Sequence, residues 1–113
     1  PGLQIRVIDL PADEADWEQT VARLHRLTLL GLGDDLAGVR VDLSSTGDDK
    51  GADIACRLTV RLRRPRRALN VEARHPDGAL ALMQAFTRAQ REAQRHLDGA
   101  RREARRQVLG GQD

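Results

Sequence analysis

Apolar and polar residues alternate with a period of two in four segments of the chain, a pattern typical of β-strands that bury one face. The four segments are residues 3–9, 39–43, 54–63 and 68–73. The alternation is clearest in the third segment, where apolar side chains alternate with small, polar or basic ones over ten residues. A shift by one residue would turn this apolar set towards water, so the register of the strand is well determined.

The sequence also predicts how the second, third and fourth strands are connected. A polar run rich in Ser, Gly and Asp over residues 44–53 favours a long hairpin between the second and third strands. Pro65 has no amide proton to offer a sheet ladder, so it ends the third strand and begins a short, basic turn.

Two further segments carry apolar residues at helical spacing. The first set is Trp17, Val21, Leu24 and Thr28, and the second is Leu82, Met83, Phe86, Ala89, Ala93 and Leu97. Carboxylates at positions 13, 14, 16 and 18 favour the positive end of a helix dipole, so the first helix is expected to begin among them and to end near Leu29. Asp77 is expected to cap the second helix, which reaches about Leu97 before Gly99 ends or weakens it.

The resulting order is strand, helix, strand, strand, strand, helix, which predicts an α+β fold. A four-stranded sheet with both helices packed on one face would satisfy every apolar surface at once. Residues 1–98 are expected to form this single domain, and residues 99–113 a basic C-terminal extension that frays at its Gly-Gly-Gln-Asp end. The other face of the sheet should meet water. It is expected to carry Gln4, Arg6, Arg40, Asp42, Arg57, Thr59, Arg61, Arg63, Asn70, Glu72 and Arg74.

The charge is distributed unevenly along the 113 residues, a length that fits one domain and excludes a multidomain enzyme. The net charge is only +2, but residues 1–55 hold 5 basic and 11 acidic residues, whereas residues 56–113 hold 14 basic and 6 acidic. The halves therefore carry −6 and +8. This asymmetry favours an anionic partner for the basic half, with nucleic acid as the first candidate; a solvated helix face followed by a basic tail is the alternative.

Arginine accounts for most of this positive charge. Six arginines and no acid lie between Arg57 and Arg67, and 18 of the 19 basic residues are Arg, whose planar guanidinium binds phosphate through two hydrogen bonds. Alternate residues of a strand repeat at about 6.6 Å, a spacing suited to following a phosphate backbone. The sequence therefore predicts a domain that binds structured RNA through its shape and phosphates. The predicted RNA-binding residues are Arg57, Arg61, Arg63, Arg64, Arg66, Arg67, Arg74, Arg88, Arg91 and Arg95.

Other kinds of site find little support. Cys56 alternates with the buried set of its strand, which favours an unreactive core thiol, and one Cys with three scattered His residues predicts no metal site. Trp17 and Phe86 fall on the inward stripes of their helices, so an aromatic base-stacking sheet is not expected. The glycines at 31 and 33 lack the context of a phosphate loop and favour a helix stop.

No nucleophile, base and cleft can be assembled from the sequence, so we expect no enzyme, no cofactor and no small-molecule substrate. No apolar stretch approaches the roughly 20 residues that span a bilayer. We therefore expect no membrane association and a cytoplasmic protein, a setting that its single cysteine also fits.

The order of elements and several segments resemble the hibernation-promoting factor and ribosome-associated inhibitor family of bacterial proteins. The likeness is best from Val39 to His96, in VRVDLS, CRLTVRLRRP and LNVEARHPDGALALMQAF, with arginines at 88, 91 and 95 where the family carries basic positions. The segment ARLHR at residues 22–26 is similar to the end of the family's first helix. The chain is similar to a short family member, without the second domain that long members use to dimerise.

This resemblance implies a partner, a mechanism and a state. The partner would be the small ribosomal subunit and its ribosomal RNA, and the protein would inhibit translation by occluding the decoding channel of idle ribosomes. The free protein is expected to be a monomer. The residues by themselves leave a second hypothesis open, a protein-interaction or regulatory module whose basic face docks an acidic protein.

Overall fold

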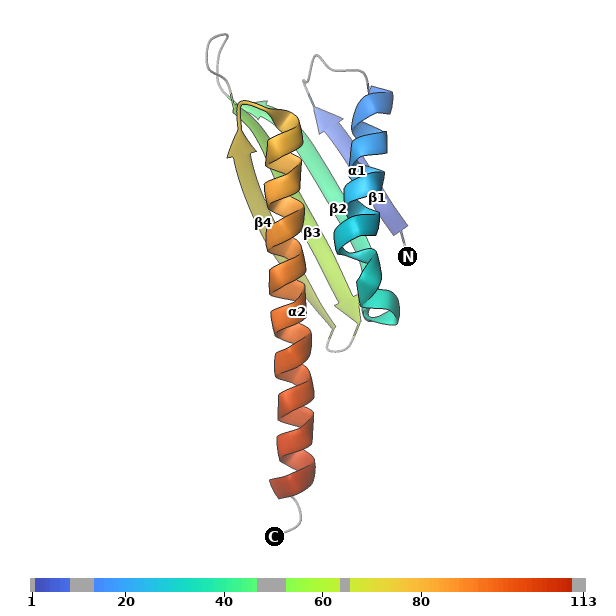
Figure 1. The fold of residues 1–113 in the computed structure, drawn as a ribbon, viewed down its shortest axis with the longest axis vertical. Helices are drawn as coiled ribbons and strands as arrows, with labels where there is room; N and C mark the ends of the chain where they lie inside the picture. The colour runs from blue at the N-terminus through green and yellow to red at the C-terminus, as the bar shows by residue number, and fades with distance from the viewer. Residues whose placement is uncertain (1, 9–13, 47–52, 64–65, 111–113) are drawn as a thin grey trace.

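The computed structural model describes residues 2–8, 14–46, 53–63 and 66–110, as four strands, two α-helices and one 3₁₀ helix (Figure 1). The elements in chain order are β1 (Gly2–Ile8), α1 (Glu14–Thr28), η1 (Leu30–Asp35), β2 (Leu36–Thr46), β3 (Asp53–Arg63), β4 (Arg66–His75) and α2 (Gly78–Gly110). The predicted α+β fold and its element order are confirmed.

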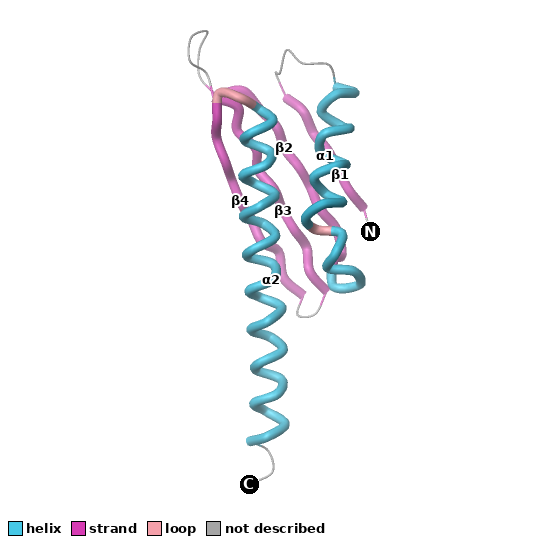
Figure 2. Tube along the Cα trace, viewed as in Figure 1, coloured by secondary structure: helices cyan, strands magenta, loops and turns pink. Residues whose placement is uncertain are grey.

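The strands form one mixed sheet in the order β1-β2-β3-β4. β1 and β2 are parallel, and α1 makes the crossover that a parallel pair requires. The remaining pairs, β2 with β3 and β3 with β4, are antiparallel. Both helices lie over the same face of this sheet, as Figure 2 shows, so the opposite face is left open.

The core lies between the sheet and the helices and consists of aliphatic side chains around Phe86, which is fully buried in α2. Cys56, Leu58, Val60 and Leu62 of β3 are all buried in it, whereas the residues that alternate with them are mostly exposed. This is the predicted two-residue pattern. No polar or charged side chain is buried among the residues that the structure describes, so apolar burial holds the layers together.

The sequence predicts the start of α2 correctly but not its end. Asp77 caps its start as expected, since the backbone amide of Ala79 donates to Asp77 Oδ1 at 2.9 Å. The expected end near Leu97 is wrong, because the helix continues through Gly99 to Gly110. One glycine costs a helix only about 1 kcal/mol, and the ARREARRQ segment that follows consists of strong helix formers. The packed part of α2 nevertheless ends at Leu97, the last buried residue of the helix that the structure describes.

The segment between α1 and β2 is shorter than the sequence pattern predicts, because β2 begins at Leu36 and not at Val39. The 3₁₀ helix η1 occupies residues 30–35 of this segment. Gly33 has a positive φ of 61° there, a backbone conformation that L side chains rarely adopt. The centre of the predicted long hairpin (47–52) and the turn containing Pro65 (64–65) lie outside the described residues.

Candidate nucleic-acid interface

Five of the predicted arginines lie on the open face of the sheet. Arg57, Arg61 and Arg63 alternate with the buried residues of β3, and all three are exposed. On β4, Arg66 pairs in register with Arg63, and Arg74 lies opposite Ala55. Exposure and register thus bring these arginines to one surface. Four of them are expected on the open face from the sequence, and the register with Arg63 adds Arg66.

Carboxylates neutralise much of the charge at the centre of this face. Arg57 lies in register between Asp42 and Glu72, but these two carboxylates pair with other residues. Arg40 Nε lies 3.3 Å from Asp42 Oδ1, and Arg74 Nη2 lies 3.1 Å from Glu72 Oε1. The centre therefore combines three arginines with two acids and presents only a small net positive charge.

The stronger positive surface lies where β3 ends and β4 begins. Arg61, Arg63, Arg66 and Arg67 line a hollow of about 790 Å³ there, which we call the arginine end of the sheet. Its other described lining residues, Ala37, Leu62 and Ala68, carry no charge. Four arginines and no described acid line this hollow, so its lining residues carry only positive charge, of the sign that attracts an anion.

Two arginines of this end differ from the others in contact or orientation. Arg63 Nη1 donates a hydrogen bond to the carbonyl oxygen of Asp34 at 3.2 Å, so it also holds η1 against the sheet. Arg67 lies opposite the buried Leu62 and therefore extends on the helix-covered side. Its even spacing from Leu69 and Val71 could have predicted this. Arg64 lies outside the described residues.

The three predicted arginines of α2 form a second basic surface. Arg88, Arg91 and Arg95 are exposed on one flank of the helix. Arg88 Nη1 donates to the carbonyl oxygen of Glu72 at 2.8 Å, so its side chain reaches the edge strand β4. The basic surface of α2 thus meets the open face at this edge, and the ten predicted residues do not form one flat patch.

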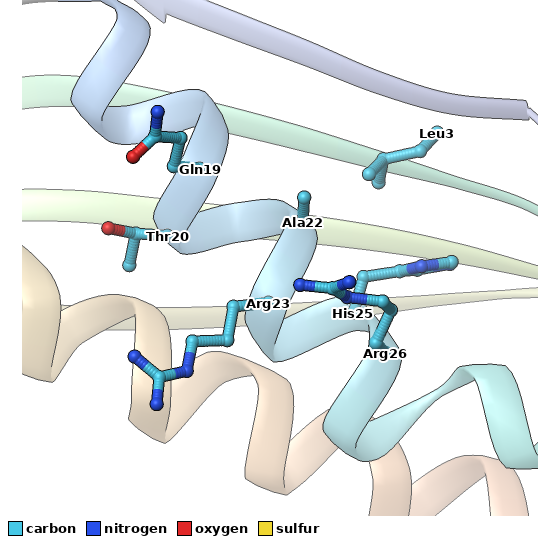
Figure 3. A pocket seen from close by; sticks show the side chains of 7 residues that line it. All are labelled: Leu3, Gln19, Thr20, Ala22, Arg23, His25 and Arg26. Atoms are coloured by element: carbon cyan, nitrogen blue, oxygen red, sulfur yellow. The ribbon is translucent and has the colours of Figure 1, made fainter.

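Basic residues also lie on α1, outside the arginine end and outside the predicted RNA-binding residues. Arg23, His25 and Arg26 line a hollow of about 710 Å³ between α1 and β1, shown in Figure 3. His25 and Leu3 of β1 both line this hollow, while the Arg23 side chain points away from Leu3 (Figure 3). Partial burial lowers the pKa of His25, which favours the neutral imidazole at pH 7.

The structure also answers two predictions about other kinds of site, a reactive cysteine and a metal centre. Burial raises the pKa of the Cys56 thiol to about 12, with a smaller contribution from Asp42, so the thiol stays protonated at neutral pH. This confirms the predicted core cysteine. Within the described ranges, no three His, Cys, Asp or Glu side chains gather in a way that could hold a metal ion. None of the described helices combines the length and the apolar character needed to cross a membrane.

Comparisons with known proteins find similarity in structure. A scan against protein-family models finds no match, and neither does a search of curated proteins. A ribosomal subunit interface protein from Coxiella burnetii has a TM-score of 0.67 with this chain at 15% identity, covering 87% of this chain and 99% of its own. The N-terminal domain of Protein Y from Thermus thermophilus has a TM-score of 0.56 at 26% identity, covering 84% of this chain and 94% of its own. The resemblance that the sequence indicated is confirmed as a likeness of fold.

Proposed function

We propose that this chain binds the small ribosomal subunit through ribosomal RNA and inhibits translation by occupying the decoding channel. The observation that carries the proposal is the arginine end of the sheet, where four arginines line one hollow and no described acid does. The fold supports it, because the similar Coxiella burnetii structure is that of a ribosomal subunit interface protein. Binding to ribosomes would make the cytoplasm its site of action.

The surface suits recognition of RNA by phosphate and shape. Arginine binds phosphate oxygens through two parallel hydrogen bonds, and such contacts fix orientation without reading base sequence. Trp17 and Phe86, the chain's two aromatic residues, both pack in the core or against it, so base stacking contributes nothing on the open face. The protein would therefore recognise the folded backbone of RNA and act by filling space, with no chemical step.

Occlusion of the channel can be tested by competition. Purified small subunits are first incubated with a saturating amount of the protein and then offered a labelled messenger RNA with its initiator transfer RNA. We expect the protein to reduce the binding of both RNAs in proportion to its own occupancy, because the three ligands would use the same space. Simultaneous binding of the protein, messenger and transfer RNA at full occupancy would contradict occlusion.

A further inference from the structure

We propose that the C-terminal part of α2, residues 98–110, is an RNA-binding arm that contacts phosphates beyond the reach of the sheet. This inference rests on the proposed RNA-binding function and adds a second contact to it. α2 has 33 residues, but its buried side chains end at Leu97. Figure 1 shows the helix continuing past the edge of the sheet where β3 ends and β4 begins, and the molecule measures 64 × 24 × 18 Å.

Most of the arm is exposed. Each residue from 101 to 108 is exposed, so no side chain in this part of the helix is buried against another element. At 1.5 Å per residue, the 12 residues after Asp98 extend about 18 Å. A helix that is polar all round gains little stability from packing against its own chain. Its stability then depends on ion pairs along the helix or on a bound partner.

The base of the arm is fixed to the body of the protein. Arg101 Nη2 lies 3.7 Å from Asp35 Oδ2 of η1, and its Nη1 lies 3.8 Å from Asp98 Oδ1. Asp98 Oδ1 also accepts a hydrogen bond from Gln94 Nε2 at 3.1 Å. The contact with Asp35 joins the start of the arm to η1, whereas the two contacts of Asp98 lie within α2 and support the helix itself where it leaves the sheet.

The arginines of the arm are the groups available to a partner. Arg102 and Arg105 have no ion pair with any described residue, and Arg106 has only a long, exposed one to Glu103 at 3.8 Å. Arg102 and Arg106 are one turn apart, about 6 Å along the axis, and lie on the same flank as Arg95. The arm therefore continues the basic surface of α2 away from the sheet.

The chemistry of the arm favours RNA over an acidic protein. Protein interfaces have an apolar core enriched in aromatic residues. The arm has no aromatic residue, and its two large apolar residues, Val108 and Leu109, stand together near its end. Phosphates need no apolar complement, and arginines on a narrow rod can bind those of a duplex through charge-assisted hydrogen bonds.

The arm is tested with the full chain and a short A-form RNA duplex of arbitrary sequence, without ribosomes. We compare the parent with Arg102→Gln/Arg105→Gln, which keeps strong helix formers, and with Arg23→Gln/Arg26→Gln on α1 as a control of equal charge. We expect the arm variant to bind the duplex about tenfold more weakly, with a salt dependence reduced by one to two counterions. The control should bind like the parent, and circular dichroism should show equal helix content.

The results separate the arm from the proposed function. Equal duplex binding by the parent and the arm variant, or no duplex binding by the parent, would contradict the proposal that the arm binds RNA. Equally tight, arm-dependent binding to polyglutamate would overturn RNA as its occupant. Binding to small ribosomal subunits is measured in parallel. Loss of duplex binding in the arm variant combined with no subunit binding by the parent would support the arm and contradict the proposed function.

Discussion

Replacing Arg61 and Arg66 with Glu should weaken binding to small ribosomal subunits by about 100-fold near 0.1 M salt. Each substitution removes a charge-assisted hydrogen bond, worth at least about 1 kcal/mol, and adds a repulsive carboxylate. Together they turn the hollow at the arginine end from uniformly basic to mixed in charge. Arg63 is left intact because it also holds η1 through the Asp34 carbonyl. Equilibrium sedimentation of a labelled protein with purified subunits gives the affinity.

The matched control for this variant is Arg23→Glu/Arg26→Glu. It makes the same change in net charge on α1, at residues that line a different hollow. We expect this variant to lose no more than about threefold in affinity, which is the effect of net charge alone when the arginines of the hollow are intact. Equal losses in both variants would mean that total charge, and not the arrangement at the end of the sheet, governs binding.

Replacing Phe86 with Ala should lower the free energy of unfolding by about 3–5 kcal/mol. Phe86 is the largest fully buried side chain of the described core, and its removal leaves a cavity between α2 and the sheet. A domain of this size is stable by only about 5–15 kcal/mol, so the change is a large fraction of the total. Urea denaturation followed by circular dichroism measures it.

Two further variants keep this stability prediction decisive. Phe86→Leu retains most of the buried volume and should cost about 1–2 kcal/mol, so it can be measured even if Phe86→Ala fails to fold. Met83→Ala, at a side chain that is half exposed on the same helix, should cost under about 1 kcal/mol. A loss for Phe86→Leu no greater than that for Met83→Ala would contradict the placement of Phe86 in the core.

The fold was largely predictable because its elements follow from local patterns. The alternation around Leu58 predicted a strand with one buried face, and the stripe around Phe86 predicted a helix that covers it. The order of strands in the sheet was not predicted, since the parallel pairing of β1 with β2 depends on a contact between segments more than thirty residues apart. The expected end of α2 near Leu97 is too early, because the strong helix formers after Gly99 offset the cost of that one glycine.

The candidate site was predicted less completely. Arg57 is one of the predicted RNA-binding residues, but the register sets it between two carboxylates, Asp42 and Glu72. These carboxylates pair with Arg40 and Arg74 and lower the net positive charge around Arg57. Cross-strand neighbours cannot be read from one strand alone, so the concentration of unpaired charge at the end of the sheet became visible only in three dimensions. The structural role of Arg88 at the β4 edge was hidden for the same reason.

The central claim is that arginines at the end of the sheet bind the phosphates of ribosomal RNA. Its most direct test is the affinity of the purified protein for small ribosomal subunits at about 50 mM and about 200 mM salt. If four or more phosphates are neutralised, affinity should fall by a factor of about 50 or more between the two conditions, because bound counterions are released. Undetectable binding at low salt, or equal affinity at both, would contradict the claim.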